Sequence, residues 1–267
     1  MTDTRERARR VHFRGGGFAP RPVRLVGPAV FLVLVAAWEA GARTGVISPL
    51  VLPAPSEAVG ALVELWVSGE LWEHLAASLS RLLLGWVSGT VLGGLIGLAI
   101  GLFSLVRAGL APLVAALFPI PKIALLPLFI IWFGIGEESK VALILFGTLF
   151  PTVIFTYGGV DNVDRTLIRM GQSFGLGWFS IVRKIILPGA LPAILSGMRV
   201  STAIAIILIV AAELIAAERG IGAYIQIAGS LFATDQLIAG VALLSVFGLT
   251  VNWMIARAER LLLRWRP

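Results

Sequence analysis

Long apolar stretches are the feature that most constrains the fold of this chain. A helix needs about 20 consecutive apolar residues to cross a bilayer, and six stretches approach or exceed that length. The predicted spans are Leu25–Gly41, Leu82–Phe103, Leu110–Phe133, Val141–Gly159, Leu191–Ala212 and Leu237–Ala256. Hydrophobic residues make up 58% of the chain and charged residues 14%, whereas soluble domains have about half and about a quarter. The sequence therefore predicts an all-α, polytopic membrane protein.

Two of the six stretches admit a second interpretation. Pro119, Pro121 and Pro127 fall inside the third stretch, and proline interrupts helices. The first stretch follows a basic leader and contains Ala-Gly-Ala at 40–42, so it also resembles a signal peptide with a cleavage site. We expect the first stretch to be retained as a span, because the set of six is incomplete without it.

The positions of lysine and arginine orient the predicted spans. Cytoplasmic loops of membrane proteins are enriched in these residues, and six spans place most of them on one side: the leader, Arg107, the loop after span four and the C-terminal tail. Both termini are then cytoplasmic. We expect a basic cytoplasmic tail at 1–24, a transmembrane domain at 25–257 with a cytoplasmic loop at about 160–190, and a second basic cytoplasmic tail at 258–267.

The second span carries a regular pattern of glycine, one at every fourth residue. Such a ridge of small residues lets another helix approach closely in lipid. The partner is either a helix of the same chain or a second subunit. The predicted helix-packing residues are Gly85, Gly89, Gly93, Gly97 and Gly101.

No set of residues in the sequence forms a recognisable catalytic site. The chain has no cysteine and no phosphate-binding loop of the G-x-x-x-x-G-K-[ST] type, and its two histidines, His12 and His74, are far apart. No histidine lies in an apolar segment, where it could serve a nucleophile as a base. We interpret the pair Glu137–Glu138 as solvated charge in a short loop. We therefore expect no enzymatic activity, no metal site and no cofactor bound by this chain.

Ionisable residues inside spans are costly and are functional by default. Glu39 lies near the outer end of span one, where it can reach water. Lys122 lies between the prolines of span three, Arg199 in the first turns of span five, and Glu213 at the end of that apolar run. These last three either line or gate a polar pathway, or they form structural pairs and snorkel to the interface.

The loop at 160–190 contains two short amphipathic segments. Leu167, Ile168, Met170 and Phe174 cluster on the first, with Arg165 and Arg169 beside them. Gly175 and Gly177 permit a sharp turn, and Trp178–Ile186 forms the second segment, which "LPGALP" closes before span five. This is either a long interfacial loop or a short helix that docks into a groove on a soluble partner.

The same loop resembles the cytoplasmic signature EAA–x3–G–x9–I–x–LP of binding-protein-dependent ABC importer permeases. Gly175, Ile185, Leu187 and Pro188 fall at the signature spacing, whereas the E-A-A positions are Arg169, Met170 and Gly171. The strings "LPAPSEAV", "LAASLSRLLLGWVSG", "PIPKIALLPLFIIWFGIGEESKV" and "GIGAYI" are similar to the nitrate/sulfonate/taurine branch. The resemblance implies that this loop docks on an ATPase subunit. Its candidate coupling residues are Arg165, Leu167, Ile168, Arg169, Met170, Gly171, Phe174, Gly175, Ile185, Leu187 and Pro188.

The resemblance implies a type I ABC importer permease in a bacterial inner membrane. Its expected partners are a second permease copy in a homodimer, two cytoplasmic ATPases that hold ATP and Mg, an external solute-binding protein and the lipid bilayer, with no nucleic acid. The branch suggests a small anion as solute: an alkanesulfonate, taurine or nitrate. An alternative is a vitamin precursor of the pyrimidine or riboflavin type. A secondary transporter is the remaining alternative, although such folds commonly carry inverted repeats and we see none.

Overall fold

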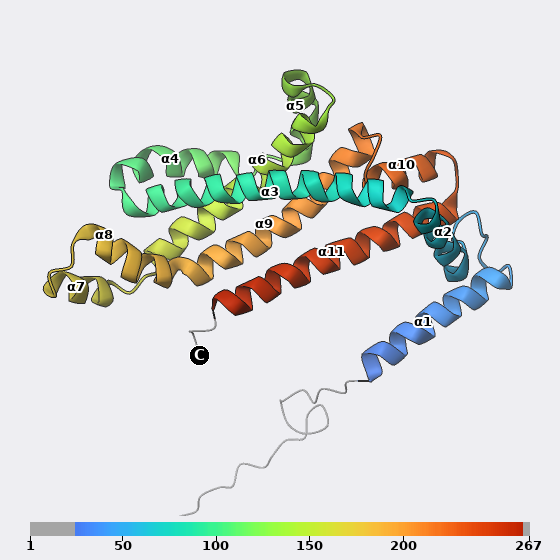
Figure 1. The fold of residues 1–267 in the computed structure, drawn as a ribbon, viewed down its shortest axis with the longest axis horizontal. Coiled ribbons are helices and arrows are strands. Elements are labelled where there is room, and N and C mark those ends of the chain that lie inside the picture. Colours follow the sequence, from blue (N-terminus) through green and yellow to red (C-terminus); the bar gives the residue numbers. More distant parts are fainter. Residues whose placement is uncertain (1–24, 264–267) are drawn as a thin grey trace, which may run out of the picture. The chain divides into compact units, whose positions relative to one another are not determined.

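The described part of the chain is built from helices. The computed structural model describes residues 25–263, so the tail predicted at 1–24 and the end of the tail predicted at 258–267 lie outside the described residues. The elements are α1 (Val26–Arg43), α2 (Pro55–Val67), α3 (Glu70–Leu102), α4 (Ser104–Leu117), the 3₁₀ turn η1 (Lys122–Leu125), α5 (Leu126–Phe133), α6 (Glu137–Asp161), α7 (Arg165–Ser173), α8 (Trp178–Ile181), the π turn η2 (Val182–Ile186), α9 (Leu187–Ala216), α10 (Ile221–Ser230) and α11 (Thr234–Leu262) (Figure 1).

Five helical segments are long and apolar enough to cross a bilayer. They are α1, α3, α6, the continuous run from α8 to α9, and α11; the bent pair of α4 with η1 and α5 is a sixth if it counts as one span. The six predicted spans correspond to these segments. Helix α3 begins twelve residues before the predicted Leu82, because the segment Glu70–Arg81, in which charged and apolar residues are mixed, continues the same helix.

The first unit of the chain, residues 1–56, contains α1. The Glu39 carboxylate accepts hydrogen bonds from the Arg43 guanidinium at 2.5 Å, from the Ser56 hydroxyl at 2.7 Å and from the Ser56 backbone N–H at 3.0 Å. A carboxylate that we expected simply to reach water therefore joins the end of α1 to Ser56, the second residue of α2.

The third predicted span is broken, which corrects the prediction of one helix over Leu110–Phe133. Helix α4 ends at Leu117, and the segment Lys122–Phe133 leaves it at an angle of 94°. Pro119 and Pro121 lie in the break. Proline cannot donate a backbone hydrogen bond and pushes the preceding residue out of the helical region, so the two prolines end α4. Pro127 lies in the first turn of α5, where a missing N–H costs nothing.

The "LPGALP" string does not close the second amphipathic segment, which corrects another prediction. The helix continues from Trp178 to Ala216, and Pro188 lies in the first turn of α9. The chain accommodates this proline by widening the preceding turn, where the Leu187 N–H bonds to the carbonyl of Val182, five residues back. π-Helical geometry occurs mostly as single turns of this kind inside α-helices.

The glycine ridge of α3 faces α6. A Cβ atom on Gly85, Gly93, Gly97 or Gly101 would lie 2.6–2.7 Å from an atom of α6, and one on Gly89 would overlap the Thr148 hydroxyl. The partners advance along α6 in the same four-residue steps, so the two helices run parallel in one register. Those partners are Ile144, Thr148, Thr152, Thr156 and Val160, together with backbone carbonyls of α6. Helix α6 packs against α9 on another side.

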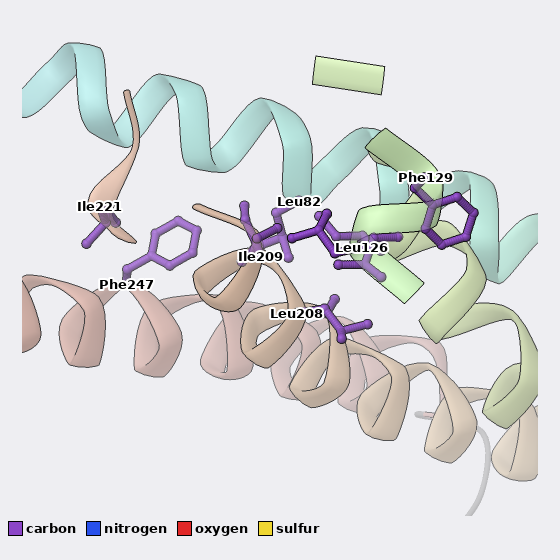
Figure 2. Close-up of a cluster of buried hydrophobic side chains, with 11 residues drawn as sticks. Leu82, Leu126, Phe129, Leu208, Ile209, Ile221 and Phe247 are labelled. Carbon is purple, nitrogen blue, oxygen red and sulfur yellow. The ribbon is translucent and has the colours of Figure 1, made fainter. Parts of the chain in front are cut away.

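The largest hydrophobic core joins α3, α5, α6, α9, α10 and α11. Leu126 begins α5 and is fully buried, although α5 turns away from α4. Figure 2 shows it beside the α3 residue Leu82, with Leu208 and Ile209 of α9 nearby. This core fixes the break in the third span relative to α3 and α9.

Candidate functional site

Helix α7 presents an apolar face at one end of the second unit, residues 57–267. Asp164 caps it by accepting the Thr166 N–H at 2.7 Å, and this bond holds the pKa of the Asp164 carboxyl below its ordinary value. Leu167, Met170 and Phe174 are exposed, Phe174 by 80%. Apolar side chains at such exposure on a helix with polar neighbours indicate a surface that another molecule or a lipid covers.

Two glycines give the 160–190 loop its shape. Gly175 has a φ of +72°, a conformation that a β-branched residue rarely adopts, and it turns the chain from α7 into the segment that starts at Gly177. Gly171 is buried, and a Cβ atom there would lie 2.8 Å from the Ile185 side chain. Gly171 therefore lets α7 pack directly on the turn that leads into α9.

The loop and α9 form a groove beside the exposed face. Its volume is about 430 Å³, and its lining comes from α7, η2 and the start of α9. Six of the candidate coupling residues line this groove: Leu167, Met170, Gly171, Phe174, Ile185 and Pro188. Ile168 instead faces inward and packs against Val160, Val163 and Ala190, while Arg165 and Arg169 are exposed on α7 and Leu187 is half-buried at the start of α9.

A buried polar cluster occupies the opposite end of the unit, where α10 lies (Figure 1). His74, Ser78 and Arg81 project from one face of α3. His74 Nδ1 accepts the Gly220 N–H at 3.1 Å, and Ser78 Oγ accepts the Ile221 N–H at 2.9 Å. These bonds satisfy two of the backbone donors that any helix leaves open at its N-terminus, so they hold the start of α10 against α3.

Glu213 of α9 lies at the centre of this cluster. Its side chain is 1% exposed and that of Arg81 is 4% exposed, and Arg81 Nη1 donates to Glu213 Oε1 at 2.8 Å. The carboxylate also accepts bonds from the Ser78 hydroxyl at 2.8 Å and from the Gly222 N–H at 2.9 Å. A buried charge is tolerated when it is paired and hydrogen-bonded, and Glu213 meets both conditions. Gly220, with a φ of +130°, leaves the room that the carboxylate occupies.

Glu137, whose side chain is more than half exposed, extends the cluster toward water, so the interpretation of Glu137–Glu138 as solvated loop charge is corrected in their placement and in the pairing of Glu137. Both glutamates lie in the first turn of α6. Arg81 donates to Glu137 Oε1 at 2.7 Å and forms a second bond to the same carboxylate, and it also donates to the Arg219 carbonyl at 2.6 Å. Arg81 thus links α3, α6, α9 and the turn before α10 through one guanidinium.

The other two predicted pathway residues lie apart from this cluster. Arg199 of α9 forms an ion pair with Glu259 of α11, and its side chain is 49% exposed. Lys122 lies at the break after α4 and donates to the carbonyls of Leu117, Phe118 and Ile120 at 2.7–3.0 Å. Its ammonium also lies 5.0 Å from the centre of the Phe150 ring. The three candidates Lys122, Arg199 and Glu213 therefore do not form one site.

The sequence contained a signal for the cluster that we did not use. His74, Ser78 and Arg81 stand at spacings of four and three, which places them on one helical face. That spacing is informative only if the three residues belong to one helix, and we had predicted that the helix begins at Leu82.

Together these features define a multi-pass helical membrane protein with a buried charge cluster at one end and an exposed amphipathic helix at the other. Residues 89–264 match the family described as the inner membrane component of binding-protein-dependent transport systems. The chain belongs to this family, which comprises permeases of ABC importers.

Relatives and solved structures agree with this assignment. The chain is 38% identical to the taurine transport system permease protein TauC of Escherichia coli strain K12 over 87% of its own length and 86% of the relative. It is also 38% identical to the putative aliphatic sulfonates transport permease protein SsuC of Bacillus subtilis strain 168, covering 88% and 85%. Its fold is similar to the MetNI methionine ABC transporter in an inward-facing conformation, with a TM-score of 0.60 at 19% identity, covering 73% of this chain and 95% of that one.

Proposed function

We propose that this permease forms the membrane pathway of an ATP-driven importer for small organic sulfonates. The exposed face of α7 is the observation that carries the proposal. A soluble partner that hydrolyses ATP must bind the membrane protein through a rigid interface if it is to move the transmembrane helices. Helix α7 offers such a contact because Gly171 lets it pack directly on Ile185. Ile185 lies near the start of the 39-residue helical segment Trp178–Ala216, which includes α9.

The groove beside α7 supports the same role. It is lined by apolar side chains around Phe174 and Pro188, with Lys184 at its edge. Such a groove suits a partner surface with an apolar side chain at its centre and acidic residues at its rim. In this arrangement ATP and Mg are bound by the partner, and this chain has no enzymatic activity of its own.

The orientation follows from this docking. The α7 end faces the cytoplasm together with both termini, and the α10 end faces an external solute-binding protein. Two copies of the permease and two ATPases complete the importer. Most substrate selection then lies with the binding protein, and the taurine and sulfonate relatives support a sulfonate as the solute.

Reconstitution tests the proposal directly. The chain is co-expressed with the ATPase of its transport system, placed in liposomes and supplied with the cognate binding protein. The ligand of that binding protein is found by calorimetry against ethanesulfonate, taurine, nitrate and riboflavin. We expect a sulfonate to bind, and the loaded binding protein to stimulate ATP hydrolysis and uptake. Uptake driven by an ion gradient without ATP would overturn the importer, and a ligand other than a sulfonate would overturn the substrate.

A further inference from the structure

Helix α3 projects beyond the membrane-spanning part of the bundle. It has 33 residues, or about 50 Å of helix, whereas the hydrocarbon core of a bilayer is about 30 Å thick. The span α6 begins at Glu137, and Arg81 of α3 bonds to that residue, so the two spans begin at one level. The preceding part of α3, Glu70–Arg81, therefore extends about 18 Å past that level, toward the end where α10 lies.

Helix α2 lies at the far end of this projection. Only Ser68 and Gly69 separate α2 from α3, and Gly69, with a φ of +84°, turns the chain between the two helices. Figure 1 shows α2 at this end of α3, crossing the direction of α3 instead of continuing it. At this height α2 lies beyond the hydrocarbon core, so lipid tails do not cover its exposed surface.

That exposed surface carries an apolar patch. The outer patch consists of the exposed residues Val59, Val63, Trp66, Val67 and Trp72. The first three follow one another at intervals of four and three, so they share one face of α2. The rings of Trp66 and Trp72 lie 5.1 Å apart between centroids, and the two residues are 57% and 53% exposed. Two exposed tryptophans among valines indicate a surface that another molecule covers.

The two helices that form the outer patch are acidic. Glu57, Glu64, Glu70 and Glu73 are exposed, and the sequence has no lysine or arginine from position 44 to position 80. Arg219 pairs with Glu73, which leaves this end of α2 and α3 with a negative net charge. A second copy of the chain would bring the same negative surface against it in a symmetric contact, and like charges oppose each other across an interface. A partner with basic residues around an apolar centre is complementary.

We propose that the outer patch is a docking surface for the solute-binding protein, an inference that rests on the importer function proposed above. The two tryptophans supply the apolar centre of the contact, and Glu64 and Glu70 face lysine or arginine side chains of the binding protein. Docking then takes place on α3, the same helix whose Arg81 holds the buried charge cluster together.

Protection of a single cysteine tests the contact. Because the chain has no cysteine, V63C can be labelled with a maleimide in the complex in nanodiscs, where both membrane faces are accessible. We expect V63C to react. Loaded binding protein at ten times its half-saturating concentration should slow the reaction about tenfold, because about one complex in ten stays free. An unrelated soluble protein is the control.

Two outcomes of the labelling would overturn the inference. A V63C variant that does not react even without binding protein would show that lipid, α1 or a second copy already covers the outer patch. A reaction that saturating binding protein leaves unchanged would show that the binding protein docks elsewhere.

Substitutions in the reconstituted importer test the energetics. W66A truncates the patch, and W253A is the matched control, because Trp253 of α11 is 61% exposed but lies in a different helix. The readout is the concentration of loaded binding protein that gives half-maximal stimulation of ATP hydrolysis. W66A should raise it about tenfold or more, the typical effect of truncating a tryptophan at an interface centre, with stimulation restored at saturation. W253A should keep the wild-type value.

Charge is tested in the same assay. E64Q should raise the half-maximal concentration about two- to threefold and weaken its dependence on salt, because one attraction at the rim is removed. An unchanged half-maximal concentration in W66A, or a stimulation that saturation does not restore, would overturn the docking surface. A wild-type complex that loaded binding protein fails to stimulate would instead overturn the proposed function.

Discussion

Two ion pairs in this chain share the same chemistry in different surroundings. Arg81 and Glu213 are almost completely buried, whereas Arg199, paired with Glu259, is half exposed. Removing one partner of a buried pair leaves a charge without compensation in a medium that solvates it poorly. Removing a partner from an exposed pair leaves a charge that water can solvate.

We therefore predict that Arg81→Met strongly destabilises the protein. The expected loss is about 3–5 kcal/mol, because Glu213 and Glu137 both lose their partner and the turn before α10 loses its contact to the guanidinium. Arg199→Met serves as the control, with an expected loss of at most about 1 kcal/mol. The measurement is the thermal midpoint of aggregation of each purified variant in one detergent.

A second substitution tests the cause of this loss. The double variant with Arg81→Met and Glu213→Leu removes both buried charges, so it should recover part of the midpoint lost in Arg81→Met. If the double variant is no more stable than the single one, an uncompensated charge is not what destabilises Arg81→Met. If the Arg81→Met and Arg199→Met variants have the same thermal midpoint, burial does not control the strength of these ion pairs.

The sequence permitted the candidate charges to be named but not paired. Glu213 and Lys122 stand out because they interrupt apolar runs. Glu137 and Arg81 do not, because each lies at a boundary where a charged residue is ordinary. Their pairing depends on the packing of α3 against α6 and α9, so it depends on contacts between residues 56 and 132 positions apart, which no local pattern encodes.

Helix α3 owes its place in the bundle to its glycines, and one of them has a neighbour that makes a matched comparison. A Cβ atom on Gly93 would lie 2.7 Å from the Leu149 carbonyl, whereas one on the adjacent Gly94 would meet nothing within 4 Å. Both residues are glycines in the same turn of the same helix. They therefore have the same intrinsic helix propensity and differ in what they face.

We predict that Gly93→Leu prevents normal assembly and that Gly94→Leu does not. A leucine at position 93 must push α6 away and so opens the register over several turns, while a leucine at 94 projects into open space. The measurement is the yield of monodisperse protein after extraction, followed by the thermal midpoint. Equal yields would show that the α3–α6 contact tolerates a bulky side chain and that the ridge does not determine the packing.

The turn after α7 offers a similar pair. Gly175 has a φ of +72° and Gly177 a φ of −68°, and a Cβ atom on either would have open space. Valine is strained only at the first, because a β-branched residue is an outlier at positive φ. Gly175→Val should therefore distort the connection between α7 and α8, whereas Gly177→Val should leave it intact.

The readout is ATP hydrolysis by the reconstituted complex with and without loaded binding protein. We predict that Gly175→Val abolishes the stimulation and lowers uptake in parallel, although the complex still forms through the exposed face of α7. Gly177→Val should keep both activities. Full stimulation and full uptake in the Gly175 variant would show that this loop does not couple hydrolysis to transport.

The boundaries of the elements were predictable to the extent that single residues set them. A turn at Gly175 and a close helix contact at the α3 glycines both follow from spacing and residue type, whereas the identity of the partner helix, α6, does not. Pro119 and Pro121 indicated a disturbance but not its size, because the 94° bend depends on the Leu126 contact with the core. The π turn at Val182–Ile186 could not be predicted, since Pro188 could have ended the helix as well as widened it.

The two ends of the second unit differ in character, and this difference predicts the topology of the whole chain. Glu138 lies near the charge cluster in the first turn of α6, and Arg169 lies on α7 at the other end; both are exposed. Because the native chain has no cysteine, a cysteine placed at either position reports without background.

We predict that Glu138→Cys and Arg169→Cys are labelled from opposite sides of the membrane. An impermeant maleimide added to intact spheroplasts should modify the first, and only lysed membranes should expose the second. The cysteine-free parent controls for nonspecific labelling. Modification of both positions from outside would contradict the arrangement of spans and the cytoplasmic placement of α7.

The close contact between α3 and α6, which involves five α3 glycines at four-residue intervals, limits how these helices can move. Neighbouring steps are four residues apart, about 6 Å along the axis, and each is occupied by an α6 side chain or carbonyl. A small slide of one helix along the other would bring α6 atoms into contact with the α3 backbone. The two helices therefore cannot slide past one another and are expected to move as one rigid body. We therefore expect a displacement of α3 to carry α6 with it, over the whole stretch from Gly85 to Gly101.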